Sequence, residues 1–131
     1  MPVEFNHTIV LAKDNHASAR FLAELLGLEV GEEWGPFVPV ALSNGVTLDF
    51  ATSPVDPIPL QHYAFLVTEA EFDAVLARIE AAGLDHYADP RMSERGINRN
   101  DGGRGTYFLD PGGHGMEVIT RPYGSGGGRL P

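Results

Sequence analysis

Two histidines and two carboxylates occupy matching positions in apolar, strand-like segments of this 131-residue chain. His7 and His62 are each the third residue of such a segment, and Asp49 and Glu117 each lie within a later one. A carboxylate among apolar neighbours is costly to bury unless a partner compensates its charge. Imidazole and carboxylate groups together suit Zn, Ni, Mn or Fe(II). The pattern therefore predicts that a divalent metal ion pairs with Glu117.

Each segment that carries a histidine leads into a predicted helix with a capping residue at its start. Asp14 caps the first helix, and Thr68 with Glu71 forms a capping box for the second. Both helices have an apolar face at helical spacing, formed by Phe21, Leu22, Leu25 and Leu26 and by Phe72, Val75, Leu76 and Ile79. Each helix ends at a Gly-Leu pair, in which glycine is the usual left-handed C-terminal cap.

The same order of elements occurs twice, which indicates an internal duplication. His7 lies 20 residues before Gly27, and His62 lies 21 residues before Gly83. Shorter strand candidates follow each helix, at 28–32, 37–42 and 46–51 and again at 85–88, 105–109 and 115–121. The pattern predicts a single α+β domain of two βαβββ modules, at about 4–52 and 60–121, with a linker at 53–59 and a flexible tail at 122–131.

Composition restricts the classes of function. The formal net charge of -9 argues against nucleic-acid binding, which requires a basic face. The absence of cysteine excludes disulfides, thiolate metal sites and a cysteine nucleophile. No signal peptide and no apolar stretch of membrane-spanning length is visible, so we expect a cytoplasmic protein with a small-molecule substrate.

The segment from Tyr107 to Glu117, YFLDPGGHGME, resembles the Y-x-x-D-P-x-G-x-x-x-E signature of the vicinal oxygen chelate superfamily. That superfamily includes glyoxalase I, extradiol ring-cleaving dioxygenases, fosfomycin resistance proteins and bleomycin resistance proteins. His7 and His62 match the first-strand histidine of each module in the superfamily. The resemblance covers the chain from Phe5 to about Arg121.

The resemblance implies that the two modules curl into an open, cup-shaped mixed sheet and that the protein is a homodimer. It implies that His7, His62 and Glu117 hold a divalent ion, which is Fe, Mn, Zn or Ni. Positions left open on the ion would bind two neighbouring oxygens of a substrate and stabilise a developing oxyanion. Asp49 lies where glyoxalase-like members have a fourth ligand, and it serves either as that ligand or as a group that orients one.

The sequence departs from individual subfamilies of this superfamily. Ring-cleaving dioxygenases have a histidine shortly before the signature tyrosine, and residues 97–104 contain none. Asp49 is one methylene shorter than the usual glyoxalase glutamate, and no glutathione, phosphonate or potassium site is recognisable. We therefore expect a metal-dependent lyase, isomerase or oxygenase of unassigned subfamily. The alternative is a metal-free binding protein of the bleomycin-resistance type.

Other polar residues are weaker candidates. Tyr107 either hydrogen-bonds a substrate or is a buried strand aromatic. Asp49 and Tyr107 are the only candidates for acid–base catalysis. We expect no chemical role for His114, and we expect His16 and His86 at the surface. The insertion at 87–105 contains four arginines, which either form a lid over an anionic substrate, lie in solvent, or pair with a second subunit. Trp34 and Phe37 either line the cup or pack elsewhere.

Overall fold

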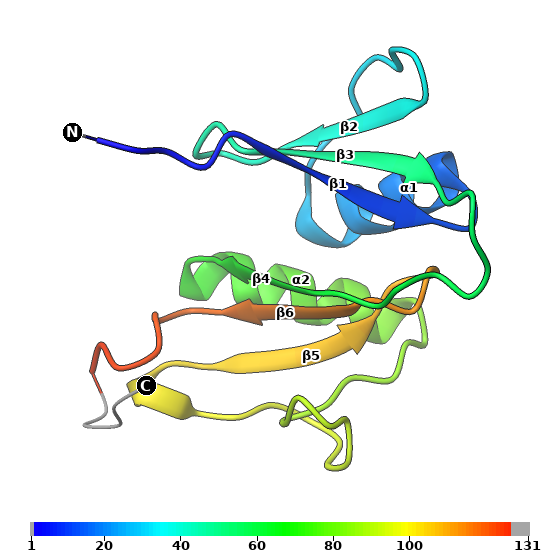
Figure 1. The fold of residues 1–131 in the computed structure, drawn as a ribbon. Coiled ribbons are helices and arrows are strands. Elements are labelled where there is room, and N and C mark those ends of the chain that lie inside the picture. Colours follow the sequence, from blue (N-terminus) through cyan, green and yellow to red (C-terminus); the bar gives the residue numbers. More distant parts are fainter. Residues whose placement is uncertain (1, 127–131) are drawn as a thin grey trace. The chain divides into compact units, whose positions relative to one another are not determined.

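The first repeat is a three-stranded mixed sheet with one helix packed against it (Figure 1). Strand β1 (His7–Ala12) leads into helix α1 (Asn15–Leu26), and β2 (Phe37–Ala41) and β3 (Thr47–Thr52) follow. In the order β1-β3-β2, strand β1 is parallel to β3 and β2 is antiparallel to it. The structure is a computed structural model and describes residues 2–126.

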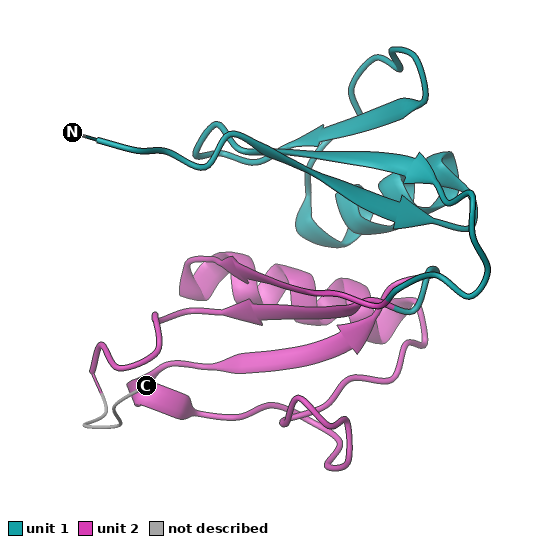
Figure 2. Ribbon diagram, in the orientation of Figure 1, with its two compact units in different colours: residues 1–59, 111–113 teal, residues 60–110, 114–131 magenta. Residues whose placement is uncertain are grey.

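The second repeat has the same sheet topology as the first. Strand β4 (His62–Leu66) leads into α2 (Glu69–Ala81), and a short 3-10 turn η1 (Asn100–Gly102) precedes β5 (Gly105–Leu109) and β6 (Gly115–Ile119). The order is β4-β6-β5, with β4 parallel and β5 antiparallel to β6. Figure 2 colours the two compact units, of which the first comprises the residues up to 59 together with 111–113. The predicted fold class of two tandem α+β modules is confirmed.

The strand predicted after each helix is reduced to isolated bridges. Val30 pairs with Val40, and the N–H of Gly31 donates to the carbonyl of Pro39 at 2.8 Å. Proline has no N–H to return that bond, so the ladder cannot extend along β2. In the second unit Tyr87 exchanges both backbone hydrogen bonds with Tyr107 at 2.8 Å, and Pro90 follows within three residues. The local order is therefore βαββ plus a bridged segment in each unit.

The predicted helix ends are confirmed. The Asp14 carboxylate accepts a hydrogen bond from the N–H of Ala17 at 3.1 Å, and the Thr68 hydroxyl accepts one from the N–H of Glu71 at 3.1 Å. Gly27 and Gly83 both have positive φ, 70° and 68°, as left-handed C-terminal caps require. The predicted apolar faces are buried at Leu22, Leu25, Leu26, Phe72, Val75 and Ile79. Neither helix has the length and apolar character to cross a membrane in the described part of the chain.

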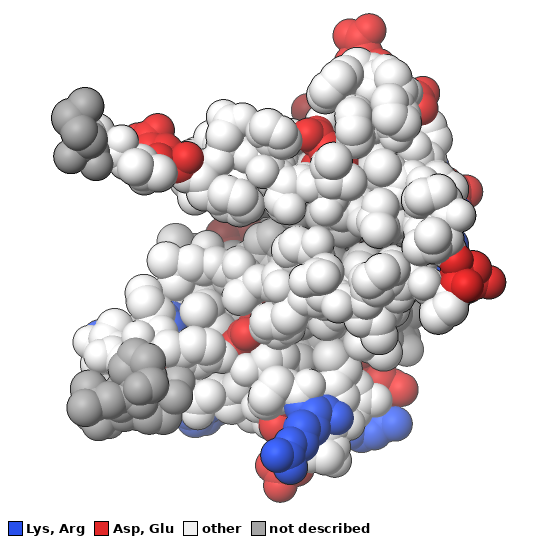
Figure 3. All heavy atoms as spheres, viewed as in Figure 1, with Lys and Arg blue, Asp and Glu red and all other residues white. Residues whose placement is uncertain are grey.

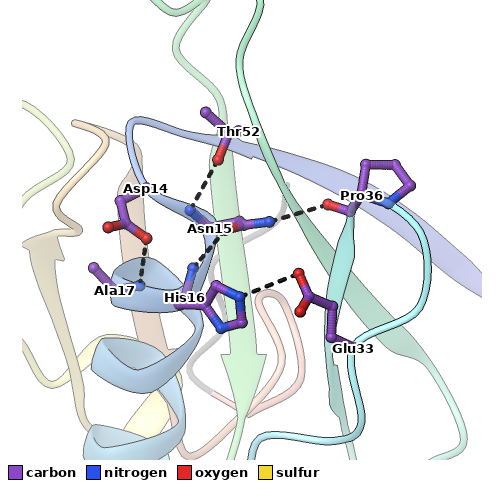
Figure 4. A network of polar contacts seen from close by, with 7 residues as sticks. All are labelled: Asp14, Asn15, His16, Ala17, Glu33, Pro36 and Thr52. Carbon is purple, nitrogen blue, oxygen red and sulfur yellow. Dashed lines mark hydrogen bonds and ion pairs between the residues drawn. The ribbon is translucent and has the colours of Figure 1, made fainter.

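The start of α1 is tied to the loop before β2 (Figure 4). The side-chain amide of Asn15 donates to the carbonyl of Pro36 at 3.1 Å, while its backbone N–H donates to the Thr52 hydroxyl at 3.2 Å. His16 Nε2 lies 3.1 Å from Glu33 Oε2, and both side chains are half exposed, as predicted for His16. These contacts fix the loop that carries Trp34, whose ring stacks at a tilt on Phe37 with centroids 4.8 Å apart.

The first unit carries most of the net negative charge. Lys13 and Arg20 are the only basic residues up to Pro59, where the acidic residues are Glu4, Asp14, Glu24, Glu29, Glu32, Glu33, Asp49 and Asp56. On the face shown in Figure 3, this unit accordingly displays red atoms and little blue. Such a surface offers no basic face to an anionic polymer.

The arginines of the insertion at 87–105 make contacts within the second unit. Arg104 Nε lies 2.8 Å from Glu69 Oε1, its Nη2 lies 2.8 Å from Asp73 Oδ1, and its guanidinium stacks 4.6 Å from the centre of the Phe72 ring. Arg95 pairs with Asp85 at 2.7 Å. Two of the four arginines are therefore engaged by acids of their own unit, which weighs against a lid made by the whole set.

The contacts of Arg104 with Glu69 predict that the free energy of unfolding depends on pH. Hydrogen bonds from Thr120 and Arg104 lower the pKa of Glu69 below its usual 4.5. Because the folded-state pKa is the lower one, the stabilisation is present above pH 4.5 and is lost as the pH falls through the folded value. Urea unfolding should therefore show Glu69→Gln to be less stable than wild type at pH 6, with the difference shrinking as the pH is lowered below 4.5. Glu71→Gln, in the same helical turn, is the control and should show a smaller difference at pH 6.

Candidate metal centre

The register of the second sheet places His62 and Glu117 on one face. His62 pairs with Gly115 and Ala64 pairs with Glu117 across the parallel strands β4 and β6. Paired residues, and residues two apart on a strand, project from the same side of a sheet. The two side chains meet, with His62 Nε2 2.9 Å from Glu117 Oε1. The structure thus brings together two of the three predicted metal ligands.

Glu117 is buried and has both carboxylate oxygens engaged. Its exposed fraction is 1%, whereas the His62 side chain is 49% exposed. Oε1 contacts His62, and Oε2 accepts a hydrogen bond from the hydroxyl of Tyr123. A buried carboxylate needs such contacts, because removing an unpaired ion from water costs on the order of several kcal/mol of folding free energy. The partners of Glu117 in this structure are therefore an imidazole and a phenol.

Tyr107 lies next to this pair on the same face. It is the direct antiparallel neighbour of Glu117 across β5 and β6, and its ring centroid lies 5.9 Å from that of His62. Tyr107 is 5% exposed, and its hydroxyl lies 2.8 Å from the Tyr123 hydroxyl. Tyr107 is thus a buried strand aromatic, one of the two alternatives given above. The Tyr123 hydroxyl links its hydroxyl to the Glu117 carboxylate.

Tyr123 is a site residue that the sequence analysis missed. It falls in the tail predicted to be flexible over 122–131, yet the next residue, Gly124, donates its N–H to Asp101 Oδ1 at 3.1 Å. The flexibility of the tail stays a prediction, and its end, 127–131, lies outside the described residues. The available signal was one aromatic residue between the last strand and the glycine-rich run.

The first unit repeats the register with a different outcome. His7 pairs with Thr47 and Ile9 pairs with Asp49, so the two residues share a face as His62 and Glu117 do. His7 is exposed and its Nδ1 lies 2.7 Å from the side-chain oxygen of Asn6. Asp49 is 5% exposed, and among the described residues no hydrogen bond or ion pair reaches its carboxylate. The shorter aspartate does not contact the histidine of its own unit.

The donors on the second sheet fit a divalent ion. An imidazole nitrogen and a buried carboxylate oxygen are the ligand types that Zn, Mn, Ni and Fe(II) accept. Within either unit alone, the described residues contain no third histidine or acid in the cluster. A third protein ligand from His7, and the role of Asp49, stay predictions.

The other histidines lie away from this face or at its edge. His114 is buried, and its Nδ1 accepts a hydrogen bond from the N–H of Gln61 at 3.0 Å. Its own N–H donates to Asp110 Oδ1 at 2.8 Å, so it fixes the turn of the signature to the start of β4. His86 is half-buried rather than exposed, with Nδ1 3.1 Å from the Thr106 hydroxyl.

Gly115 leaves room for the His62 ring, which gives a direct test of the site. A Cβ at Gly115 would lie 3.1 Å from His62 Nδ1, so in Gly115→Ala the imidazole has to shift by a few tenths of an ångström. We expect divalent-metal affinity to weaken about tenfold, as when a partner that orients a ligand is lost. Calorimetric titration with Zn measures this, and the melting temperature of the metal-free variant should not fall. Unchanged affinity would show that the His62 position does not matter for binding.

Comparison with known proteins identifies the family. Residues 4–118 match the profile of the Glyoxalase/Bleomycin resistance protein/Dioxygenase superfamily. The chain belongs to this superfamily. It is 30% identical over 118 residues to the glutathione transferase FosA of Serratia marcescens, covering 86% of the chain and 77% of that protein.

Solved structures give closer similarities. The structure of oxidase ChaP-H2 is 58% identical, with a TM-score of 0.93 over 97% of this chain and 100% of that one. Oxidase ChaP-H1 is 55% identical, with a TM-score of 0.90 over 94% and 99%. The fosfomycin resistance protein FosX of Listeria monocytogenes shares the fold, at 21% identity and a TM-score of 0.68 over 93% and 94%. FosA and the two ChaP-H proteins are named as a transferase and as oxidases, which supports an enzymatic function for this chain.

Proposed function

We propose that this superfamily member is a metal-dependent oxidase that acts on a small organic molecule with two neighbouring oxygen atoms. The observation that carries the proposal is the His62–Glu117 pair, 2.9 Å apart with the carboxylate buried, in a chain 58% identical to an oxidase. His7 is the proposed third ligand, because its place in the first sheet repeats that of His62 in the second.

Iron is the metal that this proposal favours among Fe, Mn, Zn and Ni. Two imidazoles and one carboxylate, with further positions open, form the ligand set typical of non-haem Fe(II) oxygen enzymes. Bound Fe(II) would supply the electron transfer with dioxygen that amino-acid side chains do not provide. The similarity to two proteins named oxidases supports the same choice.

The protein's own groups then bind and orient the substrate. Glu117, held by hydrogen bonds at both oxygens, presents a fixed negative charge beside the exposed imidazole of His62. The Tyr107 hydroxyl is a proposed hydrogen-bonding group on the same face. Asp49 has no partner for its buried carboxylate among the described residues, and it is the proposed base for a substrate hydroxyl.

Oxygen uptake tests the proposed reaction. Protein loaded anaerobically with Fe(II) should consume dioxygen with at least one member of a panel of catechols and hydroxyquinones, whereas Zn-loaded protein and Fe-treated Glu117→Gln should not. A redox-neutral product without oxygen uptake would instead favour group transfer, the activity named for the FosA relative. Tight substrate binding by metal-free protein, without any product, would favour the binding-protein alternative.

The origin of the third ligand is a separate question, which mixing variants answers. His7→Ala and Glu117→Gln each remove one proposed ligand, from different repeats of the chain. If ligation uses two chains of a homodimer, an equimolar mixture refolded together regains part of the metal content that each variant lacks. If ligation is within one chain, the mixture binds no more metal than the separate variants do.

A further inference from the structure

The Tyr123 hydroxyl, in a segment that follows the last strand, donates a hydrogen bond to the second carboxylate oxygen of Glu117. Strand β6 ends at Ile119, and Tyr123 lies in the turn that follows. Its hydroxyl donates to Glu117 Oε2 and lies 2.8 Å from the Tyr107 hydroxyl, while the residue is 37% exposed. A phenol therefore reaches the buried carboxylate from the surface of the unit.

The direction of this hydrogen-bond chain follows from the count of protons. A phenol has a single O–H, and that of Tyr123 is donated to Glu117. The contact between the two tyrosines must then be donated by Tyr107 to the Tyr123 oxygen. Each bond in such a chain polarises and strengthens the next. Tyr107 thus reinforces the hold of Tyr123 on Glu117.

The segment that carries Tyr123 is anchored on both sides. The N–H of Gly124 donates to Asp101 Oδ1 at 3.1 Å, and Asp101 is a 5% exposed residue with a φ of 57°. The N–H of Ser125 donates to the carbonyl of Pro122 at 3.2 Å, and Arg121 Nη2 donates to the carbonyl of Ser125 at 3.2 Å. The position of the hydroxyl therefore comes from a folded turn.

We propose that Tyr123 is a positioning residue that keeps Glu117 a one-oxygen metal ligand. Oε2 is held by the phenol, whereas Oε1 faces His62, the other proposed ligand, and is therefore the oxygen presented to a cation. This inference rests on the proposed metal-dependent function. It assigns Tyr123 the role of holding Glu117, whereas Tyr107 is the proposed hydrogen-bonding group for the substrate.

The consequence lies in how many positions the ion keeps for other molecules. Two imidazoles and one carboxylate oxygen would hold the ion and leave further positions for substrate oxygens. If Glu117 ligated through both oxygens, one of these positions would be lost. Without the Tyr123 hydroxyl, Oε2 would be free to take that position.

Spectra of Co(II)-loaded protein test the proposal without any activity assay. Tyr123→Phe removes the hydroxyl and keeps the ring, and we expect the visible Co(II) bands to change as Oε2 takes a position on the ion. Tyr63→Phe is the matched control, because Tyr63 pairs with Met116 and so faces the other side of the sheet. Its Co(II) spectrum should be the same as that of wild type.

The outcomes separate the two proposals. If wild type binds Co(II) and Tyr123→Phe gives an identical spectrum, the positioning role is overturned and the metal site stands. If wild-type protein binds no Co(II), the metal-dependent function itself is overturned. Should Tyr123→Phe fail to fold by circular dichroism, Tyr107→Phe replaces it, since losing the donor to Tyr123 should change the Co(II) bands in the same direction. An unchanged Tyr107→Phe spectrum then overturns the role.

Discussion

Glu117→Gln should reduce bound divalent metal from about one ion per chain to almost none, because the buried carboxylate is the only acid that contacts His62 in the described residues. Glutamine has the same size and keeps a carbonyl for the Tyr123 hydroxyl, so the fold should survive. The neutral amide is a poor ligand for Fe(II) or Zn. We expect the metal affinity to fall by a factor on the order of a hundred or more.

Plasma mass spectrometry on wild type and variant, after dialysis against the metal and then buffer, measures this change. Glu71→Gln is the control for removing one negative charge, since Glu71 lies in the first turn of α2, and it should retain wild-type metal. His62→Ala should resemble Glu117→Gln. Retention of stoichiometric metal by Glu117→Gln would show that the ion is held elsewhere.

Phe72→Ala should give the largest loss of stability. Phe72 is 0% exposed on α2, and the Arg104 guanidinium stacks on its ring while pairing with Glu69 and Asp73. Removing a buried phenylalanine leaves a cavity and typically costs about 3–5 kcal/mol of unfolding free energy. The loss of the cation–π contact adds to this cost at the same place.

Urea denaturation followed by circular dichroism measures the difference in unfolding free energy. Phe5→Ala is the matched control, because Phe5 is 66% exposed and precedes the first strand. It should change stability by only about 0.5 kcal/mol, as surface substitutions usually do. A loss below about 1.5 kcal/mol for Phe72→Ala would contradict the burial of the Phe72 ring described above.

The repeated fold could be predicted because its signals are local. Helix caps at Asp14 and Thr68, and glycines at 27 and 83, depend on residues within one turn, and the structure confirms each of them. Whether a strand forms directly after each helix depends instead on whether the neighbouring strand can return a backbone hydrogen bond. Pro39 cannot, so the segment around Val30 forms a bridge instead of a strand.

The site was predictable to the extent that it follows the duplication. The sequence match of His62 with His7 and of Glu117 with Asp49 corresponds to the same strand register in both sheets. In the second sheet this register brings His62 and Glu117 into contact. Tyr123 has no counterpart in that pattern. Its position depends on a turn anchored at Asp101, distant in sequence, and a glycine-rich run gives no sign of such an anchor.

The metal content of untagged wild-type protein, purified without chelator, tests the central claim most directly. The proposed function predicts about one iron per chain in protein expressed with added iron, and its removal by a chelator should abolish oxygen uptake. Protein that stays empty after dialysis against Fe(II), Mn, Zn and Ni in turn would contradict the claim, and the His62–Glu117 pair would then be a contact that serves the fold alone.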